Sequence, residues 1–231
     1  MKMNEYIKFL KKYFPEADMA SFQNEVLFNL ICESNIMSDI YIKYMDLSIL
    51  GVNVDRLMYY IRFRDCVNKL LIYLPINDGI GIYACMRYFI EQFLKYVYSL
   101  YNNNDVSKIN KTSYRHIKED INSNTNIDIN VKKEIEKIYS YYAKYSNDIH
   151  DKAVVYDKEL NFLGDILKNR NDFICRLSDD LSNFLFISYN ILNKIFNIDF
   201  NKLNAFERMS IAKMSSKKRK NRILNMLKYE K

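Results

Sequence analysis

The chain has 231 residues, 49% of them hydrophobic and 27% charged, so it is long enough and apolar enough to bury a full core. Only 4 Gly and 2 Pro are present, which excludes the usual turn chemistry of a many-stranded sheet and favours long helices. The net charge is +7, and residues 217–231 carry +6 of it, so the rest of the chain is nearly neutral and is not a basic protein throughout.

Apolar residues recur at helical intervals along most of the sequence. The helices that this pattern predicts span, in chain order, residues 4–13, 21–32, 38–47, 54–74, 82–101, 113–121, 130–151, 158–196 (with a break near 169–171) and 201–211. Pro15 and Pro75 follow the first and fourth of these helices, where a proline hinders continuation. Segment 77–81 contains two glycines but no phosphate-binding motif, so it is predicted to connect two helices.

These elements predict an all-α fold with one domain, because no linker is long enough to separate two folded units. We assign residues 1–212 to an antiparallel helical bundle and residues 213–231 to a basic amphipathic tail. Apolar residues at positions 223, 224, 226 and 227 could continue a helix through that tail.

The sequence gives no indication of export, membrane insertion or a bound cofactor. Residues 1–12 are polar and amphipathic, unlike a signal peptide, and the longest apolar runs fall far short of the ~18 residues that a membrane span needs. The cysteines lie in apolar contexts without metal-ligand spacing, so we expect reduced core thiols in preference to disulfides or zinc ligands. They are Cys32, Cys66, Cys85 and Cys175. The protein is therefore expected in the cytoplasm, with no metal and no cofactor.

Only two histidines, His116 and His150, are available as proton donors or acceptors near neutral pH. Ser146 precedes His150 by four residues near the end of a predicted helix, so their side chains share one face. The serine hydroxyl can then fix the imidazole tautomer, and the helix end favours the protonated ring. The alternative is a structural hydrogen bond without chemistry. His116 lies beside Arg115 and is either a second phosphate contact or a solvated residue.

A charge row on the predicted helix 82–101 contains Arg87, Glu91 and Lys95 at successive intervals of four residues. Such rows are usually solvated ion pairs. Alternatively, Arg87 and Glu91 approach His150, where the arginine contacts a phosphate and the carboxylate orients the ring.

Three segments together resemble the HEPN-like helical proteins of bacterial mobile elements and defence systems. They are residues 86–95 (MRYFIEQFLK), the short helix over 114–121, and residues 138–150 (IYSYYAKYSNDIH). The resemblance covers residues 83–151, which is under a third of the chain. It implies an antiparallel helical bundle, often dimeric, in which an R-x(4–6)-H motif from each subunit forms a metal-independent ribonuclease site.

His150 matches the histidine of that motif, whereas the arginine positions hold Ala143, Lys144 and Tyr145. The resemblance implies attack of an RNA 2'-hydroxyl on the adjacent phosphate, with His150 moving protons and Arg87 or Lys144 stabilising the charge. It also implies a role in antiphage defence or mobile-element conflict, with RNA and a second copy or a defence-complex protein as partners. HEPN-like domains with degenerate motifs serve as RNA-binding, scaffolding or partner-sensing subunits.

The second hypothesis is a non-enzymatic interaction or regulatory subunit that binds nucleic acid through its basic tail. The cations proposed for this contact are Lys217, Lys218, Arg219, Lys220 and Arg222. Tyr145 is a candidate for stacking on a base, whereas most of the 20 tyrosines are expected to pack at the core boundary. A membrane-surface role for the tail is disfavoured, because this segment has no Trp or Phe anchor.

Overall fold

The structure is a computed structural model that describes residues 3–15, 22–48, 54–76, 78–102, 105–150, 171–214 and 216–227. Among these residues all regular structure is helical and no strand occurs. The helices are α1 (Met3–Tyr13), α2 (Phe22–Ser48), α3 (Val54–Ile76), α4 (Gly79–Tyr101), α5 (Val106–Lys111), α6 (Tyr114–Ser123), α7 (Ile129–His150), α9 (Asn171–Phe196), the 3-10 helix η1 (Phe200–Lys202), α10 (Ala205–Ala212) and α11 (Lys217–Met226).

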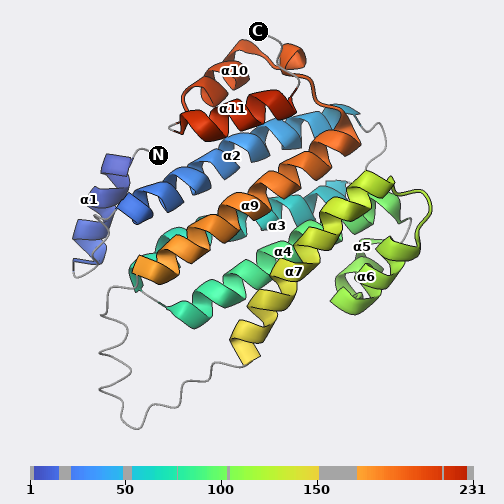
Figure 1. Cartoon of the computed structure of the whole chain (residues 1–231), viewed down its shortest axis with the longest axis horizontal. Coiled ribbons are helices and arrows are strands. Elements are labelled where there is room, and N and C mark those ends of the chain that lie inside the picture. Colours follow the sequence, from blue (N-terminus) through green and yellow to red (C-terminus); the bar gives the residue numbers. More distant parts are fainter. Residues whose placement is uncertain are drawn as a thin grey trace.

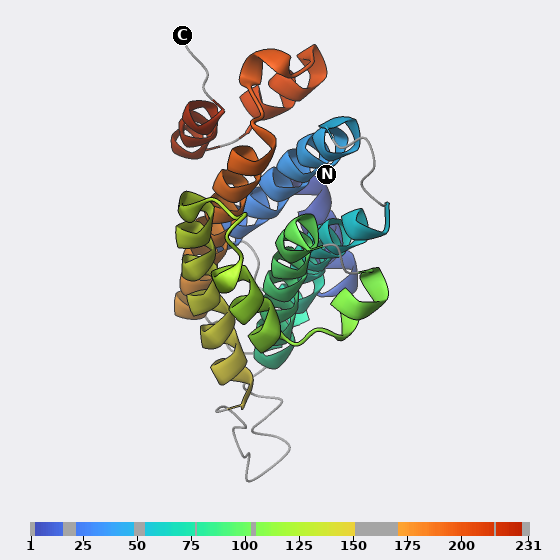
Figure 2. The same ribbon diagram turned by 90° about the vertical axis from the view of Figure 1, so that its right-hand side faces the viewer.

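The long helices α2, α3, α4, α7 and α9 form a bundle (Figure 1). Helices α3, α4 and α7 follow one another in alternating directions, and α9 packs against both α2 and α7. The short helices α5 and α6 lie beside α4, while α10 and α11 cover one end of α2 and α9 (Figures 1 and 2). The all-helical fold expected from the low glycine and proline content is confirmed.

An aromatic cluster occupies the centre of this bundle. Phe184 on α9 contacts Phe63 of α3, Phe89 and Phe93 of α4 and Tyr141 of α7, with ring centroids 4.8–6.3 Å apart. The four phenylalanine side chains are fully buried. Aromatic pairs at these separations add edge-to-face attraction to the gain from burying apolar area, so this cluster holds four helices together.

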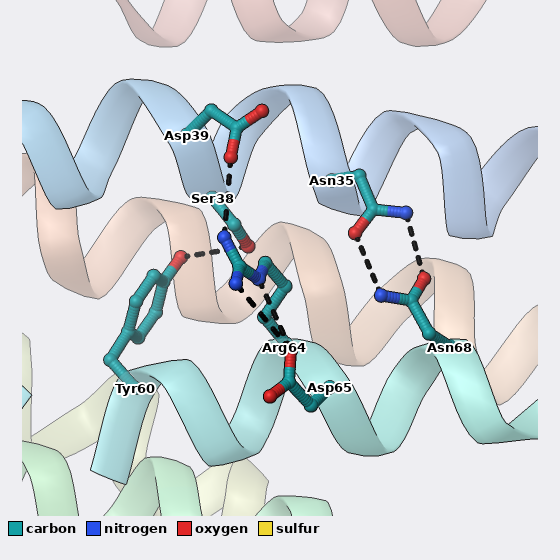
Figure 3. Close-up of polar contacts among 7 residues, drawn as sticks. All are labelled: Asn35, Ser38, Asp39, Tyr60, Arg64, Asp65 and Asn68. Carbon is teal, nitrogen blue, oxygen red and sulfur yellow. Dashed lines mark hydrogen bonds and ion pairs between the residues drawn. The ribbon is translucent and has the colours of Figure 1, made fainter. Parts of the chain in front are cut away.

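The predicted break between helices 21–32 and 38–47 is wrong, because α2 runs without interruption from Phe22 to Ser48. Two polar residues between the predicted helices, Glu33 and Asn35, have hydrogen-bond partners on other helices. Figure 3 shows Asn35 of α2 exchanging amide hydrogen bonds of 2.8 and 3.1 Å with Asn68 of α3. In the same view Arg64 donates to Asp39 across the two helices at 3.3 Å. These contacts form a polar seam between α2 and α3.

Other helix boundaries depend on capping residues. Asp78 caps α4 by accepting a hydrogen bond of 2.8 Å from the Gly81 N–H, so α4 begins three residues before the predicted start. Asp105 caps α5, a helix that the periodicity did not predict. Pro75 lies in the last turn of α3 rather than after it. The part of the predicted helix 158–196 that precedes α9 lies outside the described residues.

The basic C-terminal segment forms helix α11, which packs on the bundle. Ser216 caps this helix, and Ile223 and Leu227 are buried. Asn193 of α9 donates to the Met226 carbonyl at 2.9 Å, and Phe200 N–H donates to the Leu227 carbonyl at 3.0 Å. Residues 216–227 are therefore part of the folded body, while residues 228–231 lie outside the described part of the chain.

Candidate nucleic-acid interface

A small cavity opens where α7 ends and where α4 and α9 begin, at the lower end of the molecule in Figure 1. Its volume is about 100 Å³. The lining residues are Tyr83, Lys144, Tyr145, Phe173, Arg176, Leu177 and Asp180. Two of them, Lys144 and Tyr145, are candidate site residues predicted from the sequence.

Asp180 of α9 holds the end of α7 in place. Its Oδ2 atom accepts a hydrogen bond of 2.7 Å from the Tyr145 hydroxyl and pairs with the Lys144 ammonium group. The Tyr145 ring is buried, whereas 46% of the Lys144 side chain remains exposed. Lys144 is thus a solvent-facing cation whose charge is partly compensated by one carboxylate.

Aromatic rings form the apolar part of the cavity wall. The Tyr83 ring lies 6.0 Å from the Tyr145 ring and meets the Phe173 ring edge-on at 5.5 Å. Such contacts fix ring orientation between α4, α7 and α9. Because the Tyr145 ring is buried among these neighbours, it does not offer an open face for stacking on a base.

Arg87 of α4 points toward α7. Its Nε atom donates to the Tyr142 hydroxyl at 3.3 Å, and its guanidinium lies 5.5 Å from the centre of that ring. The Tyr142 ring also stacks on the Tyr114 ring of α6, with centroids 3.6 Å apart. Burial, and then the neighbouring Tyr142, raise the pKa of Tyr114 to about 12. Arg87 therefore faces α7 at Tyr142, which precedes position 150 by eight residues.

Glu91 does not join Arg87. Its carboxylate forms an ion pair of 2.9 Å with Lys95, and Lys95 also donates to the Asn110 carbonyl on α5 at 3.2 Å. Lys95 is buried, and its hydrogen bond to Asn110 links α4 to α5. Arg87 and Glu91 were the two residues of α4 that we considered as partners of His150. Of these, Glu91 is paired with Lys95 instead.

Ser146 and His150 both lie in the last turns of α7, as predicted. Ser146 is half-buried, and the side chain of His150 lies outside the described part of the chain. At a rise of 1.5 Å per residue, the level of Tyr142 and Arg87 is about 12 Å along the axis from position 150.

His116 lies on α6, where its Nδ1 atom shares a hydrogen bond of 2.7 Å with Ser113, and Arg115 pairs with Glu119.

The basic residues of α11 lie at the other end of the molecule. Figures 1 and 2 both show α11 at the end opposite the last turn of α7. Lys217 and Lys218 are exposed, Lys220 donates to the Ala212 carbonyl at 3.4 Å, and the Arg222 guanidinium covers the Phe186 ring. Tyr145 and the α11 cations therefore do not form one continuous surface.

Arg219 requires a correction. Its guanidinium donates to both carboxylate oxygens of Glu33, at 2.6 and 2.5 Å, and to the Ser182 hydroxyl. Only 17% of the Arg219 side chain and 5% of the Glu33 side chain are exposed. Arg219 thus fixes α11 to α2 and α9, and it is not presented to a nucleic acid.

The sequence reasoning missed Asp180, which organises the cavity. A signal was present, because Asp179 and Asp180 interrupt the apolar stripe between Leu177 and Leu181.

The described residues contain no group of three or more potential metal ligands. In that same part of the chain, no helix combines the length and apolar character needed to cross a membrane. Comparison with protein-family models, curated proteins and solved structures found no match.

Proposed function

We propose that this chain is a HEPN-like, RNA-binding protein of bacterial antiphage defence or mobile-element conflict, and that RNA contacts the end of the bundle formed by α4, α7 and α9. The observation that carries this proposal is the position of Lys144. Its side chain is 46% exposed, lines the cavity and pairs with Asp180, on the helix that ends in the Ser146 and His150 segment. Arg87 on the adjacent helix contacts Tyr142 of α7, which lies on the other side of that helix from Lys144.

The size and charge of the cavity favour a phosphate contact over insertion of a base. A volume of about 100 Å³ is smaller than the roughly 150 Å³ cavity that holds a benzene ring. Among the residues that line the cavity, Lys144 and Arg176 are cationic and Asp180 is anionic. Contacts to phosphates carry no sequence information and weaken as salt increases. We therefore expect sequence-tolerant binding of single-stranded RNA.

Metal-independent cleavage is the reaction that the HEPN resemblance implies for the same surface. In this mechanism His150 moves the proton of the 2'-hydroxyl, Ser146 orients the ring, and Lys144 stabilises charge on the phosphate. Arg87 is omitted because it contacts Tyr142, about 12 Å along the helix axis from position 150. Glu91 is omitted from this set because its carboxylate is paired with Lys95. A homodimer would bring two α7 ends together at one site.

The test is incubation of the purified protein with total RNA in EDTA, followed by native and denaturing gels. Retention of RNA without metal supports the proposal, and absence of retention at low salt would overturn it. Cleavage of RNA by the original chain that is lost in His150→Ala and in Ser146→Ala would show that the protein is also a ribonuclease. Retention without cleavage assigns the protein to the RNA-binding subunits of its class.

A second candidate function is favoured by the exposure of Lys217 and Lys218 on α11. In this alternative the bundle docks a partner protein and the basic face of α11 holds nucleic acid. The two surfaces lie at opposite ends of the molecule, so substitutions at one leave the other intact (Figure 1). Loss of RNA binding in Lys217→Ala/Lys218→Ala, with Lys144→Ala unaffected, would support this second function.

A further inference from the structure

Two buried cysteines meet between α3 and α4. Cys66 and Cys85 are 2% and 5% exposed, and their sulfur atoms lie 3.2 Å apart. Each thiol also contacts the backbone of the other residue, with Cys66 Sγ 3.3 Å from the Cys85 carbonyl and Cys85 Sγ 3.1 Å from the Cys66 carbonyl. Both helix backbones therefore approach closely at this point, as a disulfide requires.

We propose that Cys66 and Cys85 are a modification site, where a peroxide converts the two thiols into an intramolecular disulfide that joins α3 to α4. The sulfur atoms must approach by about 1 Å to reach the length of an S–S bond. Rotation of two small side chains supplies this displacement without separating the helices.

The electrostatic surroundings favour one thiolate in the pair. The hydrogen bond from Cys85 lowers the pKa of Cys66, and the positive charge of Lys69 acts in the same direction. Donating that hydrogen bond, together with burial, raises the pKa of Cys85. Because the thiolate is the nucleophile, Cys66 is the residue that reacts first.

The reaction then proceeds in two balanced steps. The Cys66 thiolate attacks one oxygen of hydrogen peroxide and the O–O bond breaks. Hydroxide departs, and Cys66 becomes a sulfenic acid. The Cys85 sulfur attacks the Cys66 sulfur, the S–O bond breaks, and the departing hydroxyl takes the Cys85 proton to form water. The hydroxide released in the first step takes up the proton that Cys66 lost on ionising. One peroxide thus consumes two thiols and yields one disulfide and two waters.

The other cysteines provide the control. Cys32 and Cys175 are half-buried. Neither of them is in a disulfide. In a Cys32→Ala/Cys175→Ala protein, the proposed pair supplies the only two thiols, so any disulfide within the chain joins Cys66 to Cys85. Circular dichroism is to be used first, to check that this double variant folds like the original chain.

The experiment treats the folded double variant with hydrogen peroxide, removes the peroxide, unfolds the chain in N-ethylmaleimide and measures its intact mass. The expected product has lost two hydrogen atoms and binds no maleimide, and dithiothreitol restores two maleimide-reactive thiols. A further Cys85→Ser change must abolish this product. The proposal is overturned if both thiols remain reactive after an exposure that oxidises Cys32 in the original chain. It is equally overturned if the disulfide forms only when urea is added before the peroxide.

Discussion

Arg219 on α11 donates two hydrogen bonds to the carboxylate of Glu33 on α2, although 186 residues separate them in sequence. Replacing Arg219 with Ala leaves a buried carboxylate without its partner. We expect the free energy of unfolding to fall by about 3–5 kcal/mol, as when one member of a buried ion pair is removed. Urea denaturation measures this change.

Lys218 is the matched control for this substitution, because it is exposed and lies next to Arg219 on the same helix. Lys218→Ala is expected to change the free energy of unfolding by less than about 0.5 kcal/mol. Equal effects of the two substitutions would show that the ion pair does not hold α11 on the bundle.

The aromatic cluster around Phe184 is expected to contribute more than any exposed apolar residue. Phe184→Ala removes a fully buried ring that contacts three other helices, so it should cost about 3–5 kcal/mol. Phe206→Ala serves as the comparison, because its side chain is 74% exposed. Chemical denaturation of the two variants in parallel gives the difference, and a loss below about 1 kcal/mol for Phe184→Ala would contradict the central position of this ring.

Asp78 and Gly81 act as one unit at the start of α4. A Cβ atom at position 81 would lie 2.3 Å from Asp78 Oδ2 and 3.0 Å from Tyr73 Cδ1. Gly81→Ala therefore displaces the capping carboxylate, and Asp78→Ala removes it, each at a cost of about 1 kcal/mol. The double variant should cost less than the sum, because both substitutions break the same hydrogen bond. Strictly additive effects in a double-mutant cycle would refute this coupling.

Buried tyrosines predict a loss of stability at alkaline pH. Burial raises the pKa of Tyr41, Tyr60 and Tyr189, and it raises that of Tyr114 to about 12. The unfolded chain loses tyrosine protons near pH 10 while the folded chain retains them, so the contribution of these tyrosines to stability is full below about pH 10 and is lost as the pH rises further. Tyrosinate absorbance followed with urea titrations tests this. If all 20 tyrosines ionised in one reversible step near pH 10 with the fold intact, the prediction would be wrong.

Helix type and order could be predicted from the sequence because they depend on local spacing. Segment 114–121 illustrates this, since Ser113 caps α6 and Ile117 and Ile121 form its buried stripe. The continuity of α2 could not be predicted in this way. The polar residues near its middle resemble a loop, and their partners, Arg219 and Asn68, lie far away in sequence.

The candidate interface shows the same division. The charge row on α4 predicted an ion pair such as that between Glu91 and Lys95 as one of two alternatives, whereas the contact of Arg87 with Tyr142 depends on how α7 packs beside α4. Asp180 was not anticipated, because its contact with Tyr145 depends on how α9 packs beside α7. The proximity of Cys66 and Cys85 likewise depends on the register between α3 and α4.

The most direct test of the proposed RNA interface is the affinity for a labelled single-stranded RNA, measured by fluorescence anisotropy at several salt concentrations. Three proteins are compared with the original chain, carrying Lys144→Ala, Asp180→Asn or Lys217→Ala/Lys218→Ala. Asp180→Asn keeps an acceptor for the Tyr145 hydroxyl and removes the charge that pairs with Lys144.

We predict that Lys144→Ala weakens binding and reduces the salt dependence by about one phosphate contact, because one ammonium group is lost. Asp180→Asn should strengthen binding, since Lys144 is then free to pair with phosphate, and the α11 double variant should bind like the original chain. Unchanged affinity in both Lys144→Ala and Asp180→Asn, together with lost affinity in the α11 variant, would contradict an RNA interface at the end of α4, α7 and α9.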